Sequence, residues 1–293
     1  MEVTRFKSIL SQIYLTLVPF LTIIFALSTG YISYKIYLPI WLLNVIFMIV
    51  AMSSLGAGNY KAANTTNKRL IIAGVFFIIP TLLTSMFFGL GAPPYESAAR
   101  WMETVTEQRV RYYFLLAAGS FIAFGFAMLS QQLKKAGEDF YALLGSVAIL
   151  IAAPVFLIDM SFWGFFLTRM YQMMVDTHAA KTPEWVIPLR IMFYYVNIFA
   201  SALVYLATAL FALSLKKTQW FKPAACTCYV VTSLLFLVLD LLPPTLPEPF
   251  TTLNFIVSIP AVPFMFPYFI GINLLLRSGN STRLQKVVAL APK

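Results

Sequence analysis

Long apolar runs, separated by short polar connections, make up most of this chain. A helix rises about 1.5 Å per residue, so about 20 apolar residues cross the hydrocarbon of a bilayer. The pattern predicts membrane-spanning helices at about residues 8–30, 36–57, 70–91, 112–133, 140–167, 190–215, 224–242 and 250–276. We therefore expect an all-α, polytopic membrane protein, with a single integral membrane domain over residues 1–293 that forms one bundle of about eight transmembrane helices.

The composition agrees with this class of protein. Hydrophobic residues make up 60% of the chain and charged residues 11%, with a mean hydropathy of +0.81. Soluble domains have about 25% charged residues, so this chain lies far outside their range. The first apolar run follows Arg5 and Lys7, as in a signal peptide, but it is too long for one and lacks a convincing cleavage site.

The formal net charge of +10 is explained by topology. In a soluble protein such a charge suggests nucleic acid, but here the connections on the side of the N-terminus hold twice as many Lys and Arg residues as those on the opposite side. Basic residues are retained on the cytoplasmic side, so both termini, including the basic tail 277–293, are predicted to be cytoplasmic. We expect a plasma membrane or a bacterial inner membrane, contact with anionic lipid, and no nucleic-acid partner.

The last apolar run is interrupted by Pro260, Pro263 and Pro267. Each proline lacks an N–H group and crowds the carbonyl four residues before it, which frees the carbonyls of Ile256, Ile259 and Pro263 near the middle of the membrane. Lipid cannot satisfy these groups, so they need water, a neighbouring helix or a ligand. The pattern indicates a broken helix that faces the protein interior, although proline kinks also help bundles to pack.

Two acidic residues, Asp159 and Asp240, lie within predicted spans. An ionisable group near the bilayer centre costs several kcal/mol, so each is a candidate functional residue. With the predicted helix directions, Asn44, Asn197 and Asn254 fall in the same outer half of the membrane. These five residues and the three prolines are the candidate ligand-binding set. They predict an outward-facing cavity at the broken helix, lined by Trp163, Tyr194, Tyr195 and Tyr268.

The two carboxylates also have a structural interpretation. Asp159 is suited to binding a cation or relaying a proton. Alternatively, Asp159 and Asp240 are interfacial residues hydrogen-bonded to their neighbours, or Asp159 pairs with Arg169 or Arg190. The sequence leaves both interpretations open.

Two longer outer loops, Ala92–Arg111 and Thr168–Leu189, are predicted to form helices on the membrane surface. In the first, Glu103, Glu107 and Arg111 share one helical face. The second carries Met170, Met173 and Met174 near Asp176 and His178. Soft ligands of this kind suit copper(I), but an amphipathic helix whose methionines sit among lipid headgroups is the favoured interpretation.

Small residues in two spans are interpreted as packing residues. Cys226 and Cys228 are expected to be buried hydrophobes, because a C-x-C pair in an apolar helix has neither a disulfide framework nor a zinc spacing. The fourth span has a row of small residues suited to close helix contact: Ala118, Gly119, Ala123 and Ala127.

Three functions remain open. The sequence has no phosphate-binding glycine loop, no HExxH and no G-x-S-x-G, so we expect no cofactor and no metal site and favour a non-enzymatic role. The first hypothesis is a protein that binds or transports a small molecule or ion. The second is a non-enzymatic accessory or sensory membrane protein. The third is a lipid-modifying enzyme that uses Asp159 or Asp240 with a tyrosine as acid and base.

Overall fold

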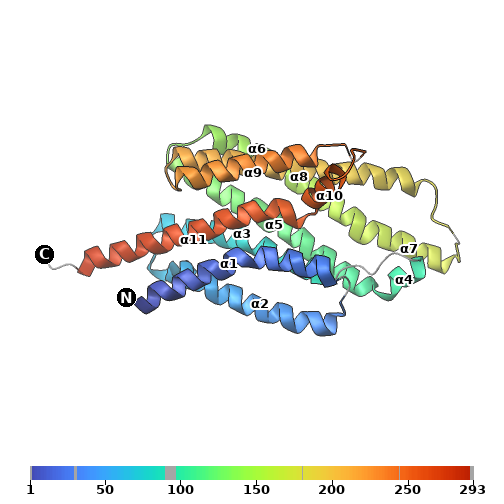
Figure 1. Cartoon of the computed structure of the whole chain (residues 1–293), viewed down its shortest axis with the longest axis horizontal. Helices are drawn as coiled ribbons and strands as arrows, with labels where there is room; N and C mark the ends of the chain where they lie inside the picture. Colours follow the sequence, from blue (N-terminus) through green and yellow to red (C-terminus); the bar gives the residue numbers. More distant parts are fainter. Residues whose placement is uncertain (1, 30–31, 90–96, 180, 244, 291–293) are drawn as a thin grey trace.

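Helices form nearly all of the computed structural model, which describes residues 2–29, 32–89, 97–179, 181–243 and 245–290. The elements in chain order are α1 (Glu2–Thr29), α2 (Tyr34–Leu55), the 3-10 helix η1 (Ala57–Ala62), α3 (Thr65–Gly89), α4 (Ala98–Glu103), α5 (Val105–Lys135), α6 (Phe140–Ser161), the π-helix η2 (Phe162–Phe166), α7 (Leu167–Asp176), α8 (Val186–Lys217), α9 (Pro223–Asp240), α10 (Phe250–Ser258) and α11 (Ala261–Leu290). Within these ranges, eight helical stretches are long and apolar enough to cross a membrane. The protein is an all-α polytopic bundle, as predicted (Figure 1).

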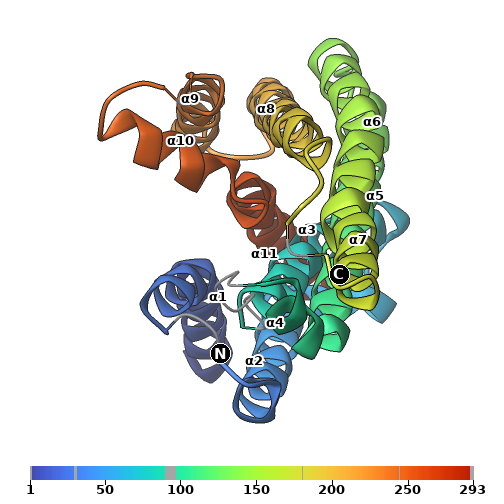
Figure 2. The same cartoon turned by 90° about the vertical axis from the view of Figure 1, so that its right-hand side faces the viewer.

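Helix α11 lies at the centre of the bundle (Figure 2). Helices α1 and α2 lie on one side of it, and α8 and α9 lie on the other. Both chain ends lie at the same end of the bundle (Figure 1), which an even number of spans requires. The cytoplasmic location of that end remains a prediction.

Glycines allow α11 to take this central place. A Cβ atom on Gly271 would lie 2.7 Å from the carbonyl oxygen of Gly74 in α3, and one on Gly74 would lie 2.9 Å from that of Gly271. Near the end of the bundle that holds the termini, a Cβ atom on Gly279 would collide with the carbonyl oxygen of Leu55 in α2. The backbones of these helices therefore touch, as small residues permit between membrane helices.

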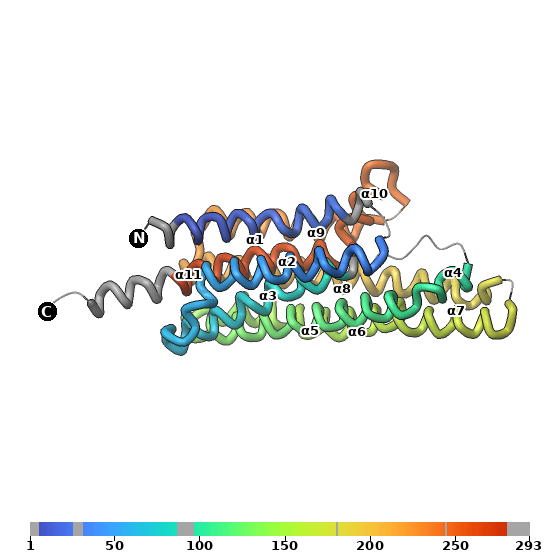
Figure 3. The backbone as a smooth tube through the Cα atoms, turned by 90° about the horizontal axis from the view of Figure 1, so that it is seen from below, coloured from blue at the N-terminus to red at the C-terminus, as the bar shows by residue number. Residues whose placement is uncertain are grey.

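Three helices are longer than the membrane is thick. Helix α5 has 31 residues, α8 has 32, and α6, η2 and α7 form one continuous stretch of 37. At about 1.5 Å per residue these measure roughly 46, 48 and 55 Å, against about 30 Å of hydrocarbon. They reach past the ends of α1 and α2 on the side opposite the termini (Figure 3). We call α4, α7 and the first turns of α8 the outer extension.

The first outer loop does not form the single surface helix that the sequence predicts. Residues 92–96 lie outside the described part. Helix α4 ends at Glu103, and Thr104 separates it from α5, which contains Glu107 and Arg111. The prediction is wrong because the Thr104 hydroxyl donates a hydrogen bond to the Trp101 carbonyl at 3.2 Å and helps to end the short helix.

The second outer loop differs from its prediction for another reason. It continues α6 through η2 into α7, so it extends past the ends of α1 and α2 on the side opposite the chain termini (Figure 3). Met170 and Met174 are buried in a cluster covered by Trp101 of α4, and only Met173 of the three methionines is exposed. The placement among lipid headgroups is therefore wrong for Met170 and Met174, because α4 covers that face, and for the exposed Met173 it remains a prediction.

Replacing Gly271 by Leu is expected to lower the unfolding midpoint in detergent, because the new side chain would enter the backbone contact with Gly74. Overpacking of this kind costs about 1–3 kcal/mol. Cys228→Leu is the control: the structure leaves Cys228 exposed, whereas Cys226 is buried as expected. Equal midpoints for the two variants would contradict the close contact of α3 and α11.

Candidate functional site

The last predicted span is built from two helices with a break between them. Helix α10 ends at Ser258 and α11 begins at Ala261. Ile259 between them has extended backbone angles, φ −62° and ψ 126°, and Pro260 follows with no N–H group. The helix long enough to span the membrane is thus Ala261–Gly279, and α10 lies at a steep angle to it at the outer end (Figure 1).

The prolines do not free all the carbonyls that the sequence predicts. The carbonyls of Ile256 and Ile259 accept short turn bonds from the N–H groups of Ile259 and Val262, at 3.3 and 2.8 Å. Pro263 lies in the first turn of α11, where a missing N–H removes no intrahelical bond. Only Pro267 lies deeper inside that helix. There it removes the intrahelical donor of the Pro263 carbonyl, as predicted, and the carbonyls of the last residues of α10 are also open.

Helix α8 satisfies these carbonyls. The Tyr205 hydroxyl donates to the carbonyl of Val257 at 2.8 Å, and the Asn197 side-chain amide donates to that of Ser258 at 2.9 Å. Tyr205 is fully buried, so its hydroxyl has few alternatives to this bond. A neighbouring helix, one of the partners considered from the sequence, thus supplies the donors for the carbonyls at the end of α10.

Asn254 of α10 forms hydrogen bonds to both α9 and α8. Its side-chain nitrogen lies within hydrogen-bond distance of the carbonyls of Leu239, Asp240 and Leu242, at 3.1, 2.8 and 3.1 Å, where α9 ends. Its side-chain oxygen accepts from the Tyr194 hydroxyl at 2.9 Å. We call Tyr194, Asn197, Tyr205, Asp240 and Asn254 the break cluster.

Asp240 is the titratable group of the break cluster. Its side chain is 0% exposed, and neither carboxylate oxygen has a hydrogen-bond partner within the described residues. It lies within electrostatic range of Tyr194 and Tyr205. A buried carboxylate without donors or a nearby cation is costly, so such a group carries a proton or attracts a cation.

Asp159 is a second buried carboxylate, at the end of α6 beside the π-helix. One oxygen accepts from the Trp163 indole N–H at 2.9 Å, and the other has no partner in the described part of the chain. Arg190 donates to the Tyr171 hydroxyl instead. No ion pair in that part joins Asp159 to Arg169 or Arg190, so the pairing considered from the sequence is not formed.

Two ring contacts place Asp159 at the depth of the helix break. They are Phe162 of η2 with Phe193 of α8, with centroids 3.8 Å apart, and Phe156 of α6 with Phe264 of α11, 5.4 Å apart. Asp159 lies one helical turn from Phe156 and one turn from Phe162, in the same continuous helical stretch. Asn197 lies one turn inward of Phe193, and Pro260 lies one turn outward of Phe264. The common depth inferred from sequence therefore applies to Asp159, Asn197 and the break.

Other expected members lie elsewhere. Asn44 accepts from the Tyr14 hydroxyl at 2.6 Å and lines a separate cavity of 210 Å³ between α1, α2 and α3. Tyr268 donates to the carbonyl of Leu15 at 2.6 Å in the core beside α1. Tyr195 is exposed. The structure thus brings Asn197, Asn254 and Asp240 together and leaves Asn44 apart.

Among the cavities of the described part, four have volumes of 680, 530, 210 and 10 Å³. Neither Asp159 nor Asp240 lines any of these four. The outward cavity remains a prediction.

The sequence pattern did not predict the roles of two buried polar side chains. Tyr205 gives no local signal, although a tyrosine in the middle of a span implies a buried partner for its hydroxyl. Arg111 was placed outside the fourth span, whereas the structure buries it in α5, where it donates to Gln108. Tyr112 beside it lies within electrostatic range of both Arg111 and Asp159.

Comparisons with known proteins found no matching family model, no matching curated protein and no matching solved structure.

Tyr205→Phe is expected to lower the unfolding midpoint, because it leaves the carbonyl of Val257 without a donor inside the bundle. An unsatisfied buried acceptor costs about 1–3 kcal/mol. The matched control is Tyr195→Phe, which removes the hydroxyl of an exposed tyrosine in the same helix. Identical melting of the two variants in detergent would show that Tyr205 does not hold the break.

Proposed function

We propose that this multi-pass membrane protein binds a proton or a small cation at the helix break, and that this binding accompanies transport across the bilayer. The observation that carries the proposal is Asp240, a fully buried carboxylate with no donor on either oxygen in the described part, within the group of side chains that hold the break. A carboxyl in this position costs stability unless a proton or cation offsets its charge.

The surroundings of Asp240 suit such a ligand. Tyr205 connects it to the backbone of the break, since it lies near Asp240 and donates to the carbonyl of Val257. Each carbonyl oxygen has two lone pairs, so Val257 and Ser258 each keep one acceptor position beside their bond from α8. Carboxylate and carbonyl oxygens are the usual ligands of hard cations, and broken helices supply them in membrane transporters.

The contacts of α10 also support a moving part. Helix α10 has nine residues, and four of the hydrogen bonds that hold it to α8 and α9 pass through Asn197, Tyr205 and Asn254. Helix α11, in contrast, is held by backbone contact at Gly74 and Gly271. A change in the charge of Asp240 therefore acts on α10, which is more weakly packed than α11.

Asp240→Asn tests the proposal. A ligand that binds only the folded state raises the unfolding midpoint, by about 2.7 kcal/mol of stability at 100 times its Kd. We expect acid, or one of lithium, sodium or potassium chloride, to stabilise the wild type relative to choline chloride, and this stabilisation to be lost in Asp240→Asn. Asp139→Asn, which changes an exposed carboxylate at the inner turn, should behave as the wild type.

The same variants are then compared in liposomes that contain a pH-sensitive dye. Ion-driven proton movement that is present in the wild type and absent from Asp240→Asn supports transport. Two results would contradict a site at Asp240. The unfolding midpoint of the wild type could be the same in every salt and at every pH, or Asp240→Asn could show the same shift of its midpoint as the wild type. Loss of the shift in Asp159→Asn alone would move the site to Asp159.

A second function, as an accessory protein, is favoured by the outer extension. Three large apolar side chains, Met173, Trp185 and Ile187, are more than half exposed there. A contiguous exposed apolar surface commonly marks a protein contact. A photo-crosslinking residue at position 187 should then capture a partner protein, whereas one at Val231 on the exposed face of α9 should capture lipid. Identical products at both positions would dismiss this role.

A further inference from the structure

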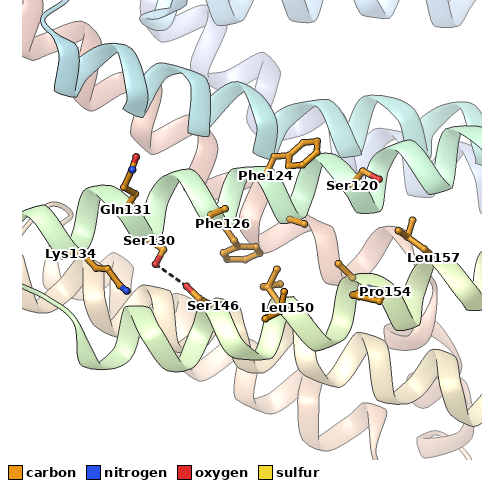
Figure 4. A pocket seen from close by; sticks show the side chains of 14 residues that line it. Ser120, Phe124, Phe126, Ser130, Gln131, Lys134, Ser146, Leu150, Pro154 and Leu157 are labelled. Atoms are coloured by element: carbon orange, nitrogen blue, oxygen red, sulfur yellow. Dashed lines mark hydrogen bonds between the residues drawn. The ribbon is translucent and has the colours of Figure 1, made fainter.

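The largest of the four cavities is a groove between α5 and α6, with a volume of 680 Å³ (Figure 4). Its lining on α5 runs from Ser120 to Lys134 along one face of the helix. Fourteen residues of helix measure about 21 Å, whereas one leaflet of hydrocarbon is about 15 Å thick. The groove is therefore long enough to follow a lipid chain from the membrane surface past the bilayer centre.

Small side chains create the groove. Ala123 and Ala127 of α5 lie opposite Ala153 of α6 in its lining. The row of small residues in α5 thus has two roles, because Gly119 touches the ring of Phe156 while Ala123 and Ala127 leave space. The expected close contact is thus found for the buried Ala118 and Gly119 and for Ala123, which also packs against the core, whereas Ala127 is exposed in the groove.

One end of the groove is polar and positive. Gln131 and Lys134, both exposed, lie at this end, and a hydrogen bond of 2.8 Å joins Ser130 to Ser146 beside them (Figure 4). None of the lining residues is acidic, and Lys134 forms no ion pair in the described part. This end faces the same side of the bundle as the chain termini, because α5 runs toward it. The other lining residues of the groove are mainly apolar.

We propose that this groove binds an anionic phospholipid of the leaflet on the side of the termini. One acyl chain lies along Ala123 and Ala127, and the headgroup phosphate meets Lys134 and Gln131. A transmembrane helix would also fit small residues, but an apolar helix would leave the charge of Lys134 without a partner. Basic pockets between helices on the cytoplasmic side are suited to anionic headgroups. This site shares no residue with the break cluster.

Lys134→Gln is the direct test. The purified chain is exchanged into nanodiscs of phosphatidylglycerol and phosphatidylcholine, and the lipid retained after extraction into mild detergent is counted by native mass spectrometry. We expect the wild type to retain phosphatidylglycerol and Lys134→Gln to hold it about fivefold more weakly, the factor that corresponds to roughly 1 kcal/mol per basic residue. Lys135→Gln, an adjacent exposed lysine outside the groove, should retain lipid as the wild type does.

Ala127→Trp provides a steric arm, because an indole would fill the groove and should reduce retention of both lipids. Its unfolding midpoint is measured alongside, and Lys134→Gln decides the question if this variant is unstable. Equal losses in Lys134→Gln and Lys135→Gln would overturn the proposal in favour of diffuse surface charge. So would equal retention of the two lipids by the wild type. If Ala127→Trp lowered the mass of the particle by one protein chain, the groove would hold a second copy of this chain and not a lipid, and the proposal would be overturned.

Discussion

The architecture of the half opposite the chain termini depends on the fact that lipid offers no hydrogen bonds to a broken backbone. Helix α10 ends inside the bundle, and the carbonyls of Val257 and Ser258 receive their donors from Tyr205 and Asn197 of α8. This need fixes α8 against α10. Asn254 then satisfies the end of α9 in the same way, so three helices meet at one polar point.

The same environment makes the buried carboxylates informative. A bundle that needed only stability would gain nothing from Asp240 or Asp159, since each has at least one oxygen without a donor in the described residues. Both stand beside an irregular helix, Asp240 near the break and Asp159 at the π-helix. Irregular backbone inside a membrane is tolerated where protein or a cavity satisfies it, and π-helices are frequent at functional sites. Charge and irregular backbone therefore point to the same level of the bundle.

The part of the fold that follows from hydrophobicity and length was predictable, including the helical class and the eight spans. Asp159 and Asp240 were also identifiable, because acidic residues in apolar runs are rare. The partners were not predictable, since depth along a helix says nothing about which helices face each other. Asn44 was expected at the depth of Asn197, but it bonds to Tyr14 of α1. The outer extension was missed for a related reason. An amphipathic face such as that of Met170 has one periodicity whether lipid or another helix covers it.

The measurement that tests the central claim most directly is infrared difference spectroscopy of the protein in liposomes, during a titration of pH and then of a monovalent cation at constant pH. Protonated and ionised carboxyl groups absorb at different frequencies, so the spectrum reports the state of Asp240 in place. The account predicts a protonated carboxyl band that weakens as pH rises or as the cation binds, and that is reduced in Asp240→Asn. A carboxyl spectrum that is unchanged in both titrations would contradict it.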